Sequence, residues 1–141
     1  MNLQFLRADE SDISVIFAQV KTLIDTYEDV SSIDYDHVMN WVSRKITKCI
    51  TEYRCVLLDG RKCAYYRLCD DGELDDLYVL PEYRSRGIGT EILQKCIADT
   101  QAPIYLYVFS RNLRAIAFYE RFGFSVRESV CNTRLIMVRN G

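Results

Sequence analysis

The sequence contains a single histidine, His37, and none of its six cysteines belongs to a Cys-x-x-Cys pair. A catalytic cysteine needs a histidine partner. His37 stands in a polar stretch ahead of an amphipathic segment, so we interpret it as a solvated residue at a helix start. Because the cysteines lie in apolar or strand-like runs, we interpret them as reduced thiols, and we expect no metal ion at the functional site.

The sequence also lacks a surplus of either charge and any long apolar run. Its 18 basic and 20 acidic side chains give a net charge of -2, which does not favour a nucleic-acid partner. No apolar run approaches the roughly 20 residues of a membrane span and no signal peptide is recognisable, so we expect a cytoplasmic protein without membrane contact. Residues 1–60 carry six basic and ten acidic residues, whereas residues 61–141 carry twelve and ten. That split would suit a cationic ligand on one side and a phosphorylated ligand on the other.

Hydrophobic spacing predicts one α/β domain over residues 1–141, with the element order β-α-α-β-β-β-α-β-α-β-β. Apolar residues three and four apart predict helices that begin near residues 13, 38, 88 and 113. Strands are predicted at residues 4–7, 53–58, 61–68, 73–80, 104–109, 125–130 and 133–138. Asp59-Gly60 and Cys131-Asn132 are typical of tight hairpin turns. The strand, loop, helix and strand in the middle of the chain should place two strands parallel, with a helix crossing one face of the sheet.

A polar loop between a strand end and a helix start, within Leu77 to Thr90, packs Arg84, Arg86, Gly87 and Gly89 into six positions. A helix N-terminus offers unpaired amides and the positive end of a dipole, and glycines let a phosphate approach the backbone. The loop therefore predicts an anion site, with a generic tight turn as the alternative. It is neither a Walker A loop nor a G-x-G-x-x-G dinucleotide fingerprint.

Two motifs together make the resemblance specific. Arg84-x-x-Gly87-x-Gly89 resembles the Q/R-x-x-G-x-G/A acyl-CoA signature of GNAT acetyltransferases. The segment from Asn112 to Phe124 resembles the family's second signature, N-x-x-A-x-x-x-Y-x-x-x-G-F. The resemblance implies the GNAT acyl-CoA N-acyltransferase fold, an α/β fold with a mixed central sheet of six to seven strands and about four flanking helices. One departure is Cys63-Ala64-Tyr65, where relatives often carry a glycine.

The resemblance implies acetyl-CoA as cosubstrate and direct attack of an amine on its thioester. The residues that it implies for cofactor binding are Leu77, Tyr78, Val79, Arg84, Ser85, Arg86, Gly87, Ile88, Gly89, Thr90, Asn112 and Tyr119. The Val79 amide would face the thioester carbonyl, and the Tyr119 hydroxyl would protonate the departing thiolate. Asn112 would cap its helix, contact the cofactor, or do both.

For the base, Glu73 is our first choice, and Asp75, Asp76 or a water stay open. Strand alternation should place Glu73 and Asp75 on the face of Leu77 and Val79 unless a bulge intervenes. Solvated carboxylates at a hairpin turn are the alternative interpretation.

The acceptor is expected to be a small-molecule amine or a polypeptide amino group, and the acidic first half of the chain hints at a polyamine or aminoglycoside. A homodimer through the last strands is possible on the resemblance. The alternative function is a catalytically silent acyl-CoA-binding module that serves as a sensor or interaction domain.

Overall fold

The computed structural model describes residues 1–140, and every helix and strand predicted from the sequence is present. The helices are α1 (Ile13–Tyr27), α2 (Tyr35–Cys49), α3 (Ile88–Asp99) and α4 (Leu113–Arg121). The strands are β1 (Leu3–Arg7), β2 (Arg54–Leu58), β3 (Arg61–Leu68), β4 (Leu74–Val79), β5 (Ile104–Phe109), β6 (Phe124–Val130) and β7 (Arg134–Arg139). Within this part of the chain, no helix has the length and apolar character needed to span a bilayer.

Local chemistry explains the ends of these elements. Asp59 and Gly60 have φ values of 51° and 82°, and Cys131 and Asn132 have 46° and 62°. Two successive positive φ values are those of type I′ turns, whose twist matches that of the flanking strands. At the start of α2, the Asp34 carboxylate accepts a hydrogen bond from a backbone amide of the first turn.

The seven strands divide into two sheets, a feature that the expected central sheet did not include. The first has the order β1-β2-β3-β4 and the second β5-β7-β6, and all named pairings are antiparallel. A single parallel bridge, from Glu73 to Tyr105, connects them. The expected parallel pairing is thus limited to one point, beyond which β4 and β5 separate. The outer edge of β4 is left without a neighbouring strand.

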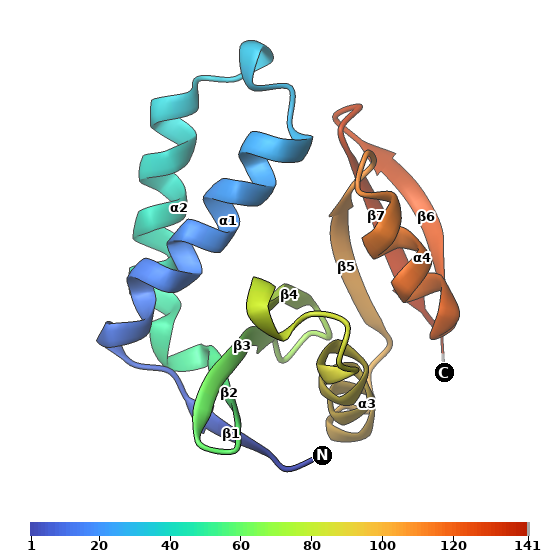
Figure 1. Cartoon of the computed structure of the whole chain (residues 1–141). Coiled ribbons are helices and arrows are strands. Elements are labelled where there is room, and N and C mark those ends of the chain that lie inside the picture. The colour runs from blue at the N-terminus through green and yellow to red at the C-terminus, as the bar shows by residue number, and fades with distance from the viewer. Residues whose placement is uncertain (141) are drawn as a thin grey trace.

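Helices cover both faces of the first sheet. Figure 1 shows α1 and α2 together on one side of the molecule, and β5, β7, β6 and α4 on the other, with β4 between them. One core cluster packs α1 and α2 on the sheet, and its members include Ile16, Val42, Ile46, Tyr53 and Tyr65. The other packs α3 and the second sheet, and includes Leu74, Ile92, Leu93, Leu106 and Met137. All six cysteines are free thiols, as expected.

Candidate functional site

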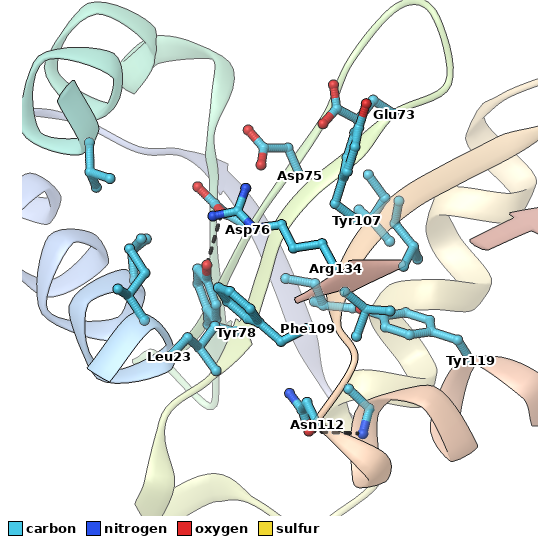
Figure 2. A pocket seen from close by; sticks show the side chains of 18 of the residues that line it. Leu23, Glu73, Asp75, Asp76, Tyr78, Tyr107, Phe109, Asn112, Tyr119 and Arg134 are labelled. Atoms are coloured by element: carbon cyan, nitrogen blue, oxygen red, sulfur yellow. Dashed lines mark hydrogen bonds between the residues drawn. The ribbon is translucent and has the colours of Figure 1, made fainter. Parts of the chain in front are cut away.

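A cavity of about 590 Å³ lies where the two sheets separate. One wall comes from α1 and α2, the floor from β4, and the other wall from β5, β7 and α4 (Figure 2). The residues predicted for the site that line it are Glu73, Leu77, Tyr78, Val79, Arg84, Asn112 and Tyr119, together with the alternative bases Asp75 and Asp76. Residues 85–90 lie outside the lining, in the loop that follows Arg84.

A β-bulge at Asp76 determines which side chains of β4 share a face. Asp76 has a φ of 59°, and the register passes from Tyr65 opposite Tyr78 to Arg67 opposite Asp75, so two residues of β4 face one residue of β3. The side chains of Leu77 and Val79 join the α3 core cluster, whereas Asp75 and Asp76 bond to Lys45 of α2. The bulge that the prediction allowed as an exception is therefore present, and it places Asp75 on the face opposite to Leu77 and Val79.

The open edge of β4 presents backbone groups to the cavity. The amide of Leu80 donates to the carbonyl of Cys63 at 2.8 Å, so Leu80 is oriented toward β3. Because neighbouring residues of a strand alternate in direction, the Val79 amide and carbonyl face the open edge. The carbonyl of Val79 accepts a hydrogen bond from Arg84 Nε at 3.2 Å. This contact leaves the Val79 amide available.

The loop before α3 carries a run of unpaired amides. Within residues 1–140, no amide from Ser85 through Thr90 donates a hydrogen bond, and the first paired amide is that of Glu91, which donates to the Gly87 carbonyl at 3.1 Å. Ser85 and Gly87 have φ values of 64° and 81°, in the left-handed region that glycine adopts readily. Free amides at the start of a 12-residue helix bind anions well.

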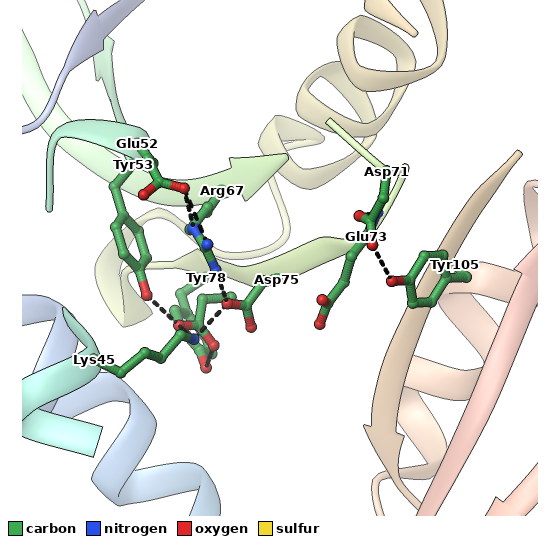
Figure 3. A network of polar contacts seen from close by, with 10 residues as sticks. Lys45, Glu52, Tyr53, Arg67, Asp71, Glu73, Asp75, Tyr78 and Tyr105 are labelled. Carbon is green, nitrogen blue, oxygen red and sulfur yellow. Dashed lines mark hydrogen bonds and ion pairs between the residues drawn. The ribbon is translucent and has the colours of Figure 1, made fainter. Parts of the chain in front are cut away.

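Glu73 is the one carboxylate of the cavity that stands apart from any ion pair. Its side chain is half-buried and makes no hydrogen bond to another described residue, and Figure 3 shows it separate from the cluster around Asp75. Burial raises the pKa of Glu73, and the negative charges of Asp75 and Asp71 raise it further. A carboxylate with a raised pKa beside a cavity is suited to accept a proton.

Asp75 and Asp76 are held in a network between β4 and α2 (Figure 3). Lys45 pairs with both carboxylates, and Arg67 donates to Asp75 at 2.8 Å. The hydroxyls of Tyr53 and Tyr78 donate to Asp76 at 2.6 and 2.8 Å. Burial raises the pKa of Tyr53, and the adjacent Asp76 raises it further, so this hydroxyl remains a donor. With their charges and lone pairs occupied in this way, Asp75 and Asp76 are poorer candidates for a base than Glu73.

Tyr119 and Asn112 lie on the α4 side of the cavity. The Asn112 side chain accepts from the Ala115 amide at 3.2 Å, so it caps α4, and it also lines the cavity. The Tyr119 ring packs against Phe118 and Phe124 at 5.2 and 5.4 Å between centroids. Its hydroxyl makes no hydrogen bond within residues 1–140, and burial raises its pKa. The phenol is thus a free proton donor at the cavity.

Several lining residues were not identified from the sequence. Trp41 of α2 is 55% exposed and lines the cavity. His37 is exposed at the start of α2, as expected, and it also lies in the lining. Arg134 and Tyr107 carried no recognisable signal, because each stands in an ordinary strand pattern.

Comparison with known proteins gives the same family as the two motifs. The acetyltransferase (GNAT) family model matches residues 20–124. An uncharacterised N-acetyltransferase of Methanocaldococcus jannaschii is 37% identical over 62 residues, which is 41% of this chain and 27% of that protein. The chain thus matches about a quarter of the length of this curated relative.

Solved structures share the fold at low sequence identity. The PaiA N-acetyltransferase of Thermoplasma acidophilum in complex with coenzyme A has a TM-score of 0.69, 17% identity and full coverage of both chains. Apo YjaB of Escherichia coli has a TM-score of 0.76 and 17% identity, covering 100% of this chain and 99% of that one. Arabidopsis thaliana Naa50, in complex with the bisubstrate analogue CoA-Ac-MVNAL, has a TM-score of 0.62, 17% identity and full coverage of both chains.

Proposed function

The chain belongs to the acetyltransferase (GNAT) family, and we propose that residues 1–141 form one domain that transfers the acetyl group of acetyl-CoA to a primary amine. The observation that carries this proposal is the run of unpaired amides from Ser85 to Thr90, next to the open edge of β4. The amides fit a diphosphate, and the edge fits the amide groups of a pantetheine arm, which would add to the sheet as an extra strand. Relatives of the same fold that hold coenzyme A or a CoA-linked analogue support this assignment.

The residues around the cavity supply the groups that the reaction needs. Acetyl-CoA would supply the activated acyl group as a thioester. The Val79 amide, on the open edge, would donate to the thioester carbonyl as negative charge develops on its oxygen. Arg84 would keep its hydrogen bond to the Val79 carbonyl, and its guanidinium would place a positive charge near the diphosphate.

Proton transfers are assigned to Glu73 and Tyr119, two titratable groups of the cavity whose side chains make no hydrogen bond within residues 1–140. Glu73 would take a proton from the incoming ammonium, directly or through a water, so that the neutral amine attacks the carbonyl carbon. As the carbon–sulfur bond breaks, Tyr119 would give its proton to the thiolate. The second proton lost by the attacking nitrogen would pass to solvent, and solvent would reprotonate Tyr119. No covalent enzyme intermediate and no metal ion take part.

The experiment that tests this function has two steps. Calorimetric titration with coenzyme A should give a one-to-one complex, and a thermal-shift series should show a rise in Tm with ligand concentration. Acetyl-CoA is then mixed with a panel of primary amines, and free thiol is measured with a thiol reagent in the presence of EDTA. Amine-dependent thiol release supports the enzyme. Tight binding without release across the panel would favour the alternative, a silent acyl-CoA-binding module.

A further inference from the structure

The part of the cavity beyond β4 has walls of apolar and aromatic side chains. α1 and α2 contribute Val20, Leu23, Val38 and Trp41, and β5 contributes Tyr107 and Phe109 from the opposite side. Trp41 and Tyr107 are 55% and 49% exposed, unusual values for residues of this size. Large aromatic side chains that face an open cavity favour an apolar ligand, because each buries a large area at small cost in side-chain entropy.

The acidic side chains of the first half of the chain do not line this cavity. None of the ten acidic residues within residues 1–60 lines it. The lining carboxylates are Glu73, Asp75 and Asp76, and the last two are occupied by Lys45, Arg67 and tyrosine hydroxyls. Only the carboxylate of Glu73 is left to face the amine that reacts. The lining therefore offers no second unpaired carboxylate to another ammonium group of the acceptor.

Arg134 adds a positive charge to the same end of the cavity. Its guanidinium lies 5.0 Å from the Phe109 ring centroid and 3.7 Å from a Glu28 carboxylate oxygen, and it makes no hydrogen bond within residues 1–140. The side chain is 39% exposed, and Figure 2 shows it extending over the cavity toward β4. The Glu28 carboxylate partly offsets this charge, but Glu28 is not in the lining, so a second ammonium on the acceptor would meet the guanidinium first and be disfavoured there.

Contacts between the two walls limit the room for a long acceptor. Tyr27 at the end of α1 stacks on Phe109 of β5 at 6.2 Å between centroids, and Glu28 reaches Arg134 of β7. These contacts join the α1 wall to the second sheet. The cavity of about 590 Å³ must also hold the reactive end of the acyl donor. The remaining volume suits a small molecule better than an extended polypeptide.

We infer that the acceptor is a small monoamine whose amine is carried on an apolar, preferably aromatic, body without a second positive charge. This inference depends on the proposed acetyl transfer and goes beyond it by naming the substrate class. It also departs from the polyamine or aminoglycoside suggested by the charge of the first half. In the complex, the amine lies near Glu73 and the apolar body lies between Trp41 and Tyr107.

The test compares amines that are matched in length. Heptylamine and 1,6-diaminohexane differ at one end, where a methyl group replaces an ammonium group, and phenethylamine tests the aromatic walls. The value of kcat/KM is measured by thiol release with saturating acetyl-CoA. We expect kcat/KM for heptylamine and for phenethylamine to exceed kcat/KM for the diamine and for spermidine by at least tenfold. A diamine or spermidine preferred to both monoamines would overturn the inference.

Two variants locate the cause of the preference. Arg134→Gln should lower the ratio of kcat/KM for heptylamine to kcat/KM for the diamine at least threefold, because the guanidinium charge is removed. Arg127→Gln, on exposed β6 outside the cavity lining, is the matched control and should leave the ratio unchanged. Trp41→Ala should raise KM for phenethylamine about tenfold without changing coenzyme A affinity. A ratio that does not respond to Arg134→Gln would overturn the role of this residue.

The outcomes separate this inference from the function on which it depends. Turnover of the diamine or of spermidine with little turnover of the monoamines would overturn the acceptor class and leave acetyl transfer intact. Coenzyme A binding without turnover of any amine would overturn both. A kcat/KM for a peptide with an N-terminal phenylalanine that is ten times that for phenethylamine would overturn only the inference that the acceptor is a small molecule.

Discussion

Removal of the Tyr119 hydroxyl separates its chemical role from its packing role. In Tyr119→Phe the ring keeps its contacts with Phe118 and Phe124, and no hydrogen bond within residues 1–140 is lost. The free energy of unfolding should therefore change by no more than about 0.5 kcal/mol. The effect on acetyl transfer should be much larger, because the departing thiolate loses its proton donor.

The magnitude follows from the acidities of the two groups. A phenol and a thiol differ by about 1.5 pKa units at their ordinary values, which corresponds to about 2 kcal/mol of unfavourable proton transfer. Burial raises the pKa of Tyr119 and makes it a weaker acid still. General acid catalysis contributes about 10²- to 10⁴-fold, so a weak acid should lie at the lower end. We expect the rate of transfer to fall about 100-fold.

The assay is single-turnover thiol release, because product release can mask a change in the chemical step. Tyr66→Phe is the matched control, since Tyr66 is a buried tyrosine that does not line the cavity, and its hydroxyl makes no hydrogen bond to any residue that the structure describes. Urea unfolding of both variants checks stability. A fall of less than about threefold in Tyr119→Phe, with stability unchanged, would refute the proton-donor role and leave Tyr119 as a packing residue.

The remaining predictions concern the base, the loop and the fold. Because Glu73 must be ionised to accept a proton and its pKa is raised by burial, wild-type kcat/KM should fall as pH drops through that raised pKa. Glu73→Gln should lower kcat/KM about 100-fold at pH 7 and progressively less toward about pH 10, where amines are neutral without help; a defect confined to high pH would exclude the base role. Glu73→Gln should not lower the free energy of unfolding at pH 7, because a carboxyl group whose pKa is raised in the folded protein destabilises the fold when it is ionised. Gly87 and Gly60 have φ values of 81° and 82°, which alanine adopts only with strain. Gly87→Ala and Gly60→Ala should therefore each lower the free energy of unfolding, measured in urea, by about 1–2 kcal/mol. Only Gly87→Ala should weaken coenzyme A binding, by about tenfold in calorimetry. If Gly87→Ala and Gly60→Ala bound coenzyme A with equal affinity, the loop would not be the diphosphate site. Asp12→Asn should cost about 1–3 kcal/mol, because the buried carboxylate accepts hydrogen bonds from Lys62, Tyr65 and the Asp9 amide. Burial raises the pKa of Asp12, but the hydrogen bonds outweigh burial, and the pKa in the folded protein is lowered. The difference in the free energy of unfolding between Asp12→Asn and wild type should therefore persist at neutral pH. In urea titrations it should vanish as the pH falls below that lowered pKa.

The order and type of the α-helices and strands follow from local patterns, and all eleven could be predicted. Helices and strands differ in the period of their apolar residues, and the two type I′ turns depend on residues that tolerate positive φ. The loop before α3 was also recognisable, because its glycines and arginines stand together in the chain. The structure adds that its amides are unpaired, which no sequence pattern states.

Tertiary structure decided which of these residues meet. The bulge at Asp76 depends on pairing with β3, and it moves Asp75 away from the face of Leu77 and Val79. Lys45 lies 30 residues from Asp75 in sequence, and their ion pair leaves Glu73 as the free carboxylate. Arg134 reaches the cavity only because β7 lies between β5 and β6 in the second sheet. Local spacing specifies elements, whereas register and packing between distant segments determine the charge and shape of the cavity.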